Sequence, residues 1–235
     1  MTSVVTGPVR LRARLDTPLS RWLWLVKWVL VLPHVVVLAL LWVAFGVLSV
    51  VAFFAILITG RYPRGLFGFN LGVLLWTWRV SYYGYSALAT DRYPPFTLAE
   101  QPEYPATLDI AHPEQLPRGL VLVKWWLLAL PHYLVLGFFL GGGSYAAYQA
   151  ADAPAPNGGW SVGSGGLIGL LALIAGVMLL FTGRYPRGVF DLLLGLHRWV
   201  LRVAAYAALM TDVYPPFRLD TGGEDPATAV ITPTA

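Results

Sequence analysis

The chain has 235 residues, of which 57% are hydrophobic, 14% aromatic and 12% charged. A soluble domain usually carries about 25% charged residues, so the composition rules out an ordinary soluble enzyme or a disordered chain and indicates an integral membrane protein. The sequence contains no cysteine, which excludes disulfides, thiolate chemistry and Cys-ligated metals. A net charge of +4 without a basic stripe predicts no nucleic-acid partner.

The chain consists of two copies of one unit. The blocks RWLWLVKW, LPHVVVL, TGRYPRGLF and TDRYPPF match RGLVLVKW, LPHYLVL, TGRYPRGVF and TDVYPPF at 25 of 31 positions, in the same order. The offset between copies rises from 98 to 123, which marks 25 extra residues in the second copy. We therefore predict an N-terminal tail over 1–7, a first repeat over 8–100, a second repeat over 105–219 with an insertion at 141–165, and a disordered tail over 220–235.

Each repeat opens with alternating apolar and polar residues. In residues 9–15 the apolar side chains alternate with Arg10, Arg12 and Arg14, and residues 106–111 alternate in the same way. A period of two predicts a half-buried strand. A lone strand is unstable, so we expect the two strands to pair on the same side of the membrane, with an even number of crossings between them.

A long apolar segment and a more amphipathic one follow in the first repeat. Residues 21–58 exceed the roughly 20 residues that span a bilayer, and Pro33 divides them. In one topology 20–32 lies in the interface, 33–58 spans and 64–90 spans back. In the other, 21–58 forms a hairpin and 64–90 lies in the interface.

The second repeat has the same order of segments, and its polar insertion must lie outside hydrocarbon. This favours a hairpin with spans near 120–148 and 165–181, and leaves open whether 187–211 spans or lies in the interface. We therefore expect a mainly α, polytopic membrane protein with about four spanning helices, within a range of four to six. The basic residues flank one side in both topologies, which predicts a multi-pass protein of the cell membrane with a cytoplasmic N-terminus.

The repeated blocks also resemble a known family. The TGRYPRGLF and TDRYPPF blocks and the LVKW–LPH run are similar to those of the bacterial membrane family catalogued as domain of unknown function 4389. The resemblance extends from about Pro8 to Leu219 and implies two tandem copies in a membrane protein, with no assigned activity and no catalytic residue to transfer. Val213, in place of Arg92, and the insertion depart from the pattern.

The two TGRYPRG blocks supply candidates for binding lipid headgroups. Their Gly and Pro should break the helix where it leaves the bilayer, and their arginines either anchor this turn or grip phosphate bidentately. The candidates are Arg61, Tyr62, Arg64, Arg184, Tyr185 and Arg187. Asp91 and Asp212 begin the YPPF blocks, and we expect each to cap backbone amides or to pair with its own repeat's Arg61 or Arg184.

Ionisable residues inside the apolar segments are further candidates. They are Arg79, Asp191, Arg198, Arg202, His34 and His132. Asp191, Arg198 and Arg202 share one helical face. Equivalent histidines in apolar helices suggest a bis-His haem, but each could also satisfy backbone carbonyls freed by the proline before it. Lys27 and Lys124 are expected to snorkel to the headgroups.

The sequence contains no GxSxG, HExxH or Walker A motif, so no enzymatic activity, cofactor or metal is expected. The expected function is a non-enzymatic scaffold or accessory subunit that binds membrane lipids or a partner, which is another protein or a second copy of itself. A small transporter or channel built from the tandem repeat is the alternative. A His-ligated haem or quinone redox protein is a further alternative.

Overall fold

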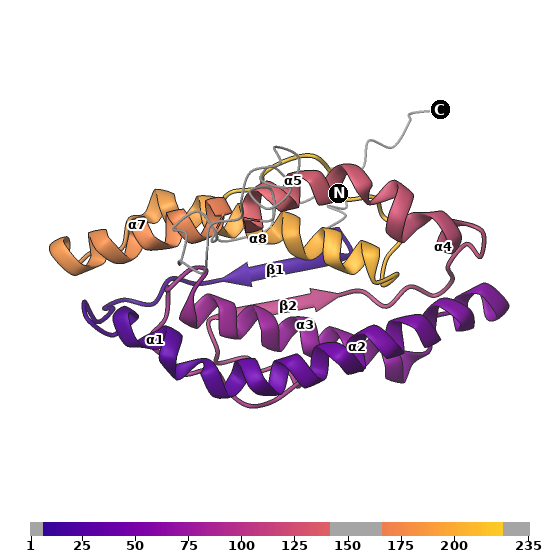
Figure 1. Ribbon diagram of the computed structural model, residues 1–235, viewed down its shortest axis with the longest axis horizontal. Coiled ribbons are helices and arrows are strands. Elements are labelled where there is room, and N and C mark those ends of the chain that lie inside the picture. Colours follow the sequence, from indigo (N-terminus) through magenta and orange to yellow (C-terminus); the bar gives the residue numbers. More distant parts are fainter. Residues whose placement is uncertain (1–6, 142–165, 223–235) are drawn as a thin grey trace, which may run out of the picture.

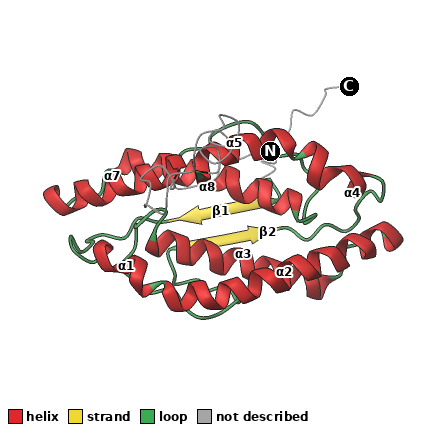
Figure 2. Ribbon diagram, viewed as in Figure 1, coloured by secondary structure: helices red, strands yellow, loops and turns green. Residues whose placement is uncertain are grey.

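The computed structural model describes residues 7–141 and 166–222. These residues form a mainly helical protein with one small sheet, as the sequence predicts (Figure 2). The expected N-terminal tail, the insertion and the C-terminal tail lie outside the described residues, apart from Gly7, Gly141 and residues 220–222.

The two predicted strands pair with each other. β1 (Val9–Ala13) and β2 (Ala106–Ile110) are antiparallel, and Leu11 lies opposite Leu108, its own counterpart in the second repeat. A pseudo-twofold axis therefore passes through this pair and relates the two repeats. Alternate residues of both strands are buried on one face of the sheet, whereas Arg12 and Asp109 are exposed on the other.

The long apolar segment of the first repeat is a short helix followed by an unbroken long one. α1 (Trp24–Leu30) precedes α2 (Leu32–Thr59), and Pro33 lies in the first turn of α2, where its missing N–H leaves no bond unmade. The hairpin considered for 21–58 is therefore wrong. α2 ends at Gly60 and is followed by α3 (Arg64–Gly84), which packs against α2 and β2.

The second repeat has the same elements with an interruption. α4 (Leu120–Val123), the π-helix η1 (Lys124–Leu128) and α5 (Leu130–Leu140) precede the insertion, and α7 (Gly166–Thr182) and α8 (Arg187–Ala207) follow it. α5 and α7 follow one another end to end along one long side of the molecule, and α2 runs along the other (Figure 1). The hairpin expected in the second repeat is therefore also wrong.

α3 and α8 lie between these two sides, and each covers the strand of the other repeat: α3 packs on β2 and α8 on β1. The main core thus includes both strands and both helices, with members such as Leu11, Trp78, Tyr82, Leu108 and Phe190. Because each helix crosses to the partner strand, neither repeat can bury its own strand alone.

Within residues 7–141 and 166–222, two helical segments are long and apolar enough to cross a membrane, Leu32–Thr59 and Leu120–Leu140, and Gly166–Thr182 is a shorter apolar helix. The expected four spanning helices are therefore not confirmed. α3 and α8 differ from these segments because most of their side chains are buried within the protein.

Candidate lipid-headgroup sites

Each TGRYPRG block forms the same helical corner. Gly60 and Gly183 end α2 and α7 with φ values of 72° and 69°, which glycine adopts without strain. The Thr59 hydroxyl donates to the Ala55 carbonyl at 2.7 Å and accepts from the Arg61 N–H at 3.2 Å. The Thr182 hydroxyl makes the equivalent bonds in the second repeat. The proline of each block then serves as the N-cap of α3 or α8.

The arginines and the tyrosine of each corner point to different environments. Arg61, Arg64, Arg184 and Arg187 are exposed. Tyr62 is buried instead, accepts a hydrogen bond from Asn70 Nδ2 at 2.9 Å, and has its pKa raised to about 12 by desolvation.

Tyr185 is also buried, and its hydroxyl donates to the Ala87 carbonyl of the first repeat. The structure thus places the two tyrosine candidates inside the core, where they fix the corners. The four arginine candidates remain on the surface.

A third arginine, contributed by the other repeat, completes each corner. A Cβ added at Gly183 would lie 2.6 Å from Arg21 Nη2, and one at Gly60 would lie 3.5 Å from Arg118 Nε. Arg21 and Arg118 are equivalent residues of the two copies, and both are exposed. Sequence reasoning used them only for orientation, although their place in a repeated block was a signal that they belong to a repeated site.

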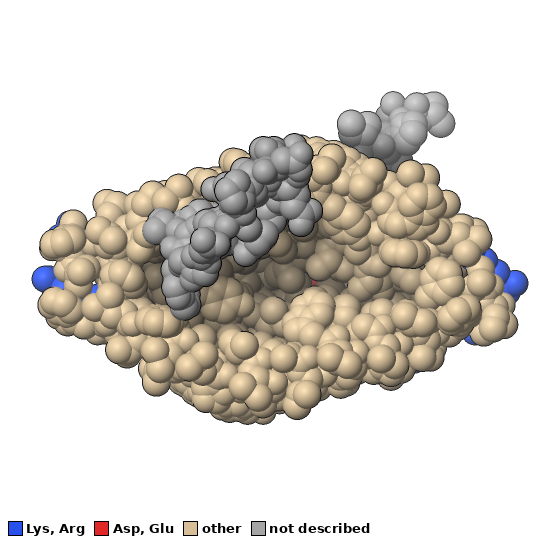
Figure 3. Space-filling model, viewed as in Figure 1, with Lys and Arg blue, Asp and Glu red and all other residues tan. Residues whose placement is uncertain are grey.

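We name the two resulting clusters by their arginines. The first arginine end comprises Arg61, Arg64 and Arg118, and the second comprises Arg184, Arg187 and Arg21. Figure 3 shows that, on the face in view, Lys and Arg gather at the two ends of the molecule, with apolar and neutral side chains between them.

Each arginine end has a cavity beside it. At the first end the cavity is about 910 Å³, and Arg61 and Arg64 line it together with His112 and Glu114. At the second end it is about 470 Å³, lined by Arg184, Arg187 and residues 15–19. Each cavity is lined by two arginines and one carboxylate, Glu114 or Asp16, so the charged side chains of each lining sum to a positive charge.

Asp91 and Asp212 pair with lysines rather than with Arg61 and Arg184. Asp91 Oδ1 lies 2.8 Å from Lys27 Nζ, and Asp212 Oδ1 lies 2.6 Å from Lys124 Nζ. Both lysines are 1% exposed, so the expected snorkelling is wrong. Burial lowers the pKa of Lys27, and the hydrogen bond to Asp91 opposes that shift.

The lysine ammonium groups also bind the chain that follows α3 and α8. Lys27 Nζ donates to the Thr90 carbonyl at 2.6 Å, and Lys124 Nζ donates to the Thr211 carbonyl. We call these following segments the first strap (88–99) and the second strap (209–220). Each strap begins with a leucine of positive φ, 57° at Leu88 and 64° at Leu209. The ion pairs therefore hold turns that leucine rarely adopts.

The arginines of α3 and α8 hold the other end of each strap. Arg79 is fully buried and donates to the carbonyls of Thr97 and Ala99. Arg202 Nη1 lies 2.5 Å from Asp220 Oδ2, at the position equivalent to Ala99. Arg79 and Arg202, named above as ionisable candidates inside the apolar segments, are therefore engaged with the straps.

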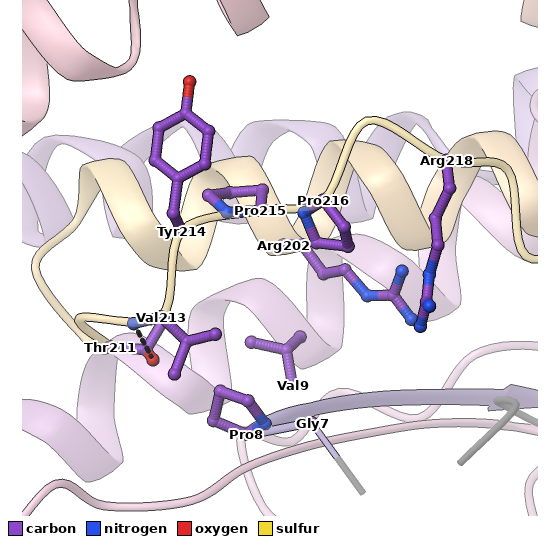
Figure 4. A pocket seen from close by; sticks show the side chains of 10 residues that line it. All are labelled: Gly7, Pro8, Val9, Arg202, Thr211, Val213, Tyr214, Pro215, Pro216 and Arg218. Atoms are coloured by element: carbon purple, nitrogen blue, oxygen red, sulfur yellow. Dashed lines mark hydrogen bonds between the residues drawn. The ribbon is translucent and has the colours of Figure 1, made fainter. Parts of the chain in front are cut away.

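Arg198 of α8 and Arg218 of the second strap also bind Asp220. Arg198 is buried and donates to the Asp220 carbonyl at 2.6 Å, and Arg218 Nε lies 3.0 Å from Asp220 Oδ1. Figure 4 shows Arg202 and Arg218 side by side at a cavity of about 170 Å³ beneath the second strap. Asp191, expected on the same helical face, is half-buried near the start of α8.

His34 and His132 lie in two equivalent aromatic boxes. The Trp76 and Trp199 indoles donate to His34 Nδ1 and His132 Nδ1, both at 3.1 Å. Phe96 stacks on His34 and Phe217 on His132, with interplanar angles of 14° in both cases. Each histidine thus accepts from an indole and holds its own strap.

The metal candidates can be assessed only in the described part of the chain. Within residues 7–141 and 166–222, no three His, Cys, Asp or Glu side chains lie close enough to hold a metal ion.

Together these elements define a helical unit that is duplicated about a pseudo-twofold axis, with one arginine cluster at each corner. The family Domain of unknown function (DUF4389) matches residues 21–97 and 163–218. The chain belongs to this family and contains two tandem copies of its domain. No curated protein and no solved structure matches the chain.

Proposed function

We propose that this chain is a non-enzymatic integral membrane protein that holds anionic lipid headgroups at its two arginine ends. The observation that carries the proposal is the pair of equivalent arginine clusters, each built from both repeats and each next to an exposed apolar helix. Two headgroup sites on one frame fit a scaffold or accessory subunit that organises lipid around a protein partner or a second copy of itself.

The exposed surfaces of α2 and of the α5–α7 pair support a hydrocarbon environment. Val36, Leu40 and Ile58 on α2 are 66%, 71% and 71% exposed, and Leu134 on α5 and Phe181 on α7 are 74% and 78% exposed. A contiguous apolar surface of this kind is unfavourable in water and favourable among lipid chains.

The arginine ends have the chemistry that phosphate requires. A guanidinium donates in a planar fork that matches the oxygens of a phosphate ester. Three such groups at one corner carry positive charge and therefore attract an anionic headgroup. The cytoplasmic membrane surface, which is negative, supplies such headgroups. Gly60 and Gly183 allow Arg118 and Arg21 to approach the corner backbone closely, which draws the third guanidinium toward the pair.

The same geometry bears on the topology. α2 runs from one end of the molecule to the other, and both strands lie midway along that length (Figure 1). If α2 crossed the bilayer, the exposed Arg12 and Asp109 of the sheet would lie at hydrocarbon depth, where charge is costly. We therefore propose that α2 lies along one leaflet, with both arginine ends and the sheet at the cytoplasmic surface. The multi-pass topology expected from the sequence is the alternative.

Lipid retention tests the proposed activity. The full chain is reconstituted in nanodiscs of phosphatidylglycerol and phosphatidylcholine, extracted in mild detergent and analysed by native mass spectrometry. We expect about two retained phosphatidylglycerol molecules per chain, and about one fewer for the variant Arg61→Gln, Arg64→Gln, Arg118→Gln. The matched control Arg10→Gln, Arg12→Gln, Arg14→Gln removes the same charge from the N-terminal strand region and should retain both lipids. Equal retention of the two lipid types, or equal losses in both triple variants, would contradict the proposal.

A further inference from the structure

Another cavity, of about 400 Å³, lies where the two repeats meet. Residues of α3 and α8 line it, with Leu140 and Ile168 from the ends of α5 and α7. Trp78 and Leu201, which are equivalent residues of the two copies, both line it, so the cavity lies across the pseudo-twofold axis. The face in Figure 3 is hollowed near its middle, where α3 and α8 lie.

Two residues that line this cavity carry a buried polar group without a partner. The Trp78 indole N–H and the Ser86 hydroxyl make no hydrogen bond within the described residues, and their residues are 2% and 4% exposed. A buried polar group without a partner costs stability, and such groups in a native protein call for an explanation.

A third polar group at the cavity has a defined role. His197 is 7% exposed, its ring lies 4.9 Å from that of Trp78, and its Nδ1 lies 2.7 Å from the Leu193 carbonyl. A carbonyl only accepts, so Nδ1 carries the proton and the neutral ring presents Nε2 as an acceptor. Desolvation lowers the pKa of His197 to about 4, so the ring is neutral at pH 7.

The two copies differ at these three positions. Trp78 aligns with Leu201 of the second copy, and His197 aligns with Leu74 of the first. Ser86 aligns with Ala207, because each immediately precedes the alanine that begins the matching Ala-Leu pair. The fold therefore accepts apolar residues at these positions. The three polar residues come together at this cavity because the first copy contributes Trp78 and Ser86 and the second contributes His197.

We propose that this central cavity binds a small apolar molecule that ends in a hydroxyl group, such as a phenol. A hydroxyl group accepts one hydrogen bond and donates another, which suits the Trp78 N–H and His197 Nε2, and Ser86 can serve as either partner. The apolar body of the ligand would pack on Ile168 and Leu201. The volume lies within the 300–1,000 Å³ or so that is usual for small-molecule sites.

Histidine NMR tests the proposal on the full chain in detergent micelles. The chain has four histidines, so ¹⁵N-histidine labelling gives one reporter at the cavity and three internal controls. We expect 2-naphthol to shift the His197 Nε2 resonance saturably and to leave His34, His112 and His132 unchanged. 2-Methylnaphthalene, which has the same shape without the hydroxyl, should bind at least tenfold more weakly.

Variants separate hydrogen bonding from packing. Trp78→Phe and Ser86→Ala should each raise the Kd of 2-naphthol several-fold, up to about tenfold, whereas Thr107→Ala on the exposed sheet face should not. In calorimetry, His197→Leu should abolish binding, and its matched control His112→Leu should retain it. Equal shifts at all four histidines, equal affinity for the two naphthalenes, or unchanged affinity in the cavity variants would overturn the proposal.

Discussion

The long apolar helix is continuous in one repeat and interrupted in the other. The 11 residues of α5 and the 17 of α7 together match the 28 of α2, residue for residue, with the insertion between the counterparts of Trp42 and Val43. The interruption closes tightly, because a Cβ at Gly166 would lie 2.3 Å from Gly141 N. The chain therefore leaves and re-enters the helix at adjacent points.

The corners, straps and lysine ion pairs occupy equivalent positions in both repeats despite this interruption. α2 and the α5–α7 pair contribute mainly exposed apolar surface, whereas the corners and straps hold α3, α8 and the sheet together. The packing of α3, α8 and the sheet therefore depends on the repeated blocks, whereas the long apolar helix accepts an insertion.

The largest expected effect is at the buried ion pairs. Asp91→Ala and Asp212→Ala each leave a lysine that is 1% exposed without its carboxylate. Removing one partner of a buried pair is strongly destabilising, and we expect a loss of about 3 kcal/mol in the free energy of unfolding for each variant. Denaturant titration in mixed micelles measures it. A loss below about 1 kcal/mol for either variant would contradict the expectation that the buried ion pair of that repeat stabilises the fold.

The second repeat should have one source of pH dependence that the first lacks, because Leu74 replaces His197 in the first. Burial lowers the pKa of His197 to about 4 from 6.5. The unfolded chain therefore binds a proton in that window which the folded chain does not, so stability falls as the pH drops from 6.5 toward 4. From pH 7 to pH 5 we expect a loss of about 2 kcal/mol.

Unfolding measured at pH 7 and pH 5 tests this expectation. The variant His197→Leu should lose the corresponding part of the pH dependence, and His112→Leu should keep it. Identical pH profiles for His197→Leu and the unaltered chain would contradict the assignment to His197.

The smallest effect should distinguish the two straps. A Cβ at Gly72 would lie 2.7 Å from Leu98 Cβ and 2.9 Å from its carbonyl oxygen, whereas at the equivalent Gly195 the nearest atom, Asp220 O, is 3.3 Å away. Overpacking outweighs the helix propensity that alanine adds. Gly72→Ala should therefore cost about 1 kcal/mol and Gly195→Ala less than about 0.5 kcal/mol. Thermal unfolding measures both, and equal shifts would contradict the difference in strap packing.

Sequence reasoning predicted the elements whose signal is local or repeated. The alternation at 9–15 and 106–111 predicted two strands, and they pair. The Gly and Pro of the TGRYPRG blocks predicted a corner, which forms twice. Pro33 predicted a division of the apolar segment, and the segment does divide at Val31, between α1 and α2, with Pro33 in the first turn of α2.

Contacts between segments that are distant in the sequence could not be predicted from local patterns or repeats. Lys27 lies beside apolar residues in the sequence, and its partner Asp91 is far along the chain, so burial of the pair depends on the fold. Arg21 and Arg118 reach the corner of the opposite repeat, which only the pseudo-twofold arrangement makes visible. The same holds for Trp78 and His197, which approach each other from different repeats.

The central claim is that both arginine ends lie at one membrane surface, and single-cysteine labelling tests it most directly. The chain has no cysteine, and a Cβ at the equivalent positions Gly65 and Gly188 meets nothing within 4 Å. Gly65→Cys and Gly188→Cys are each expressed in the full chain and treated with a membrane-impermeant maleimide in right-side-out and inside-out vesicles. We predict that both react only in inside-out vesicles. Reaction of one in each vesicle type would place the ends on opposite surfaces and contradict the account.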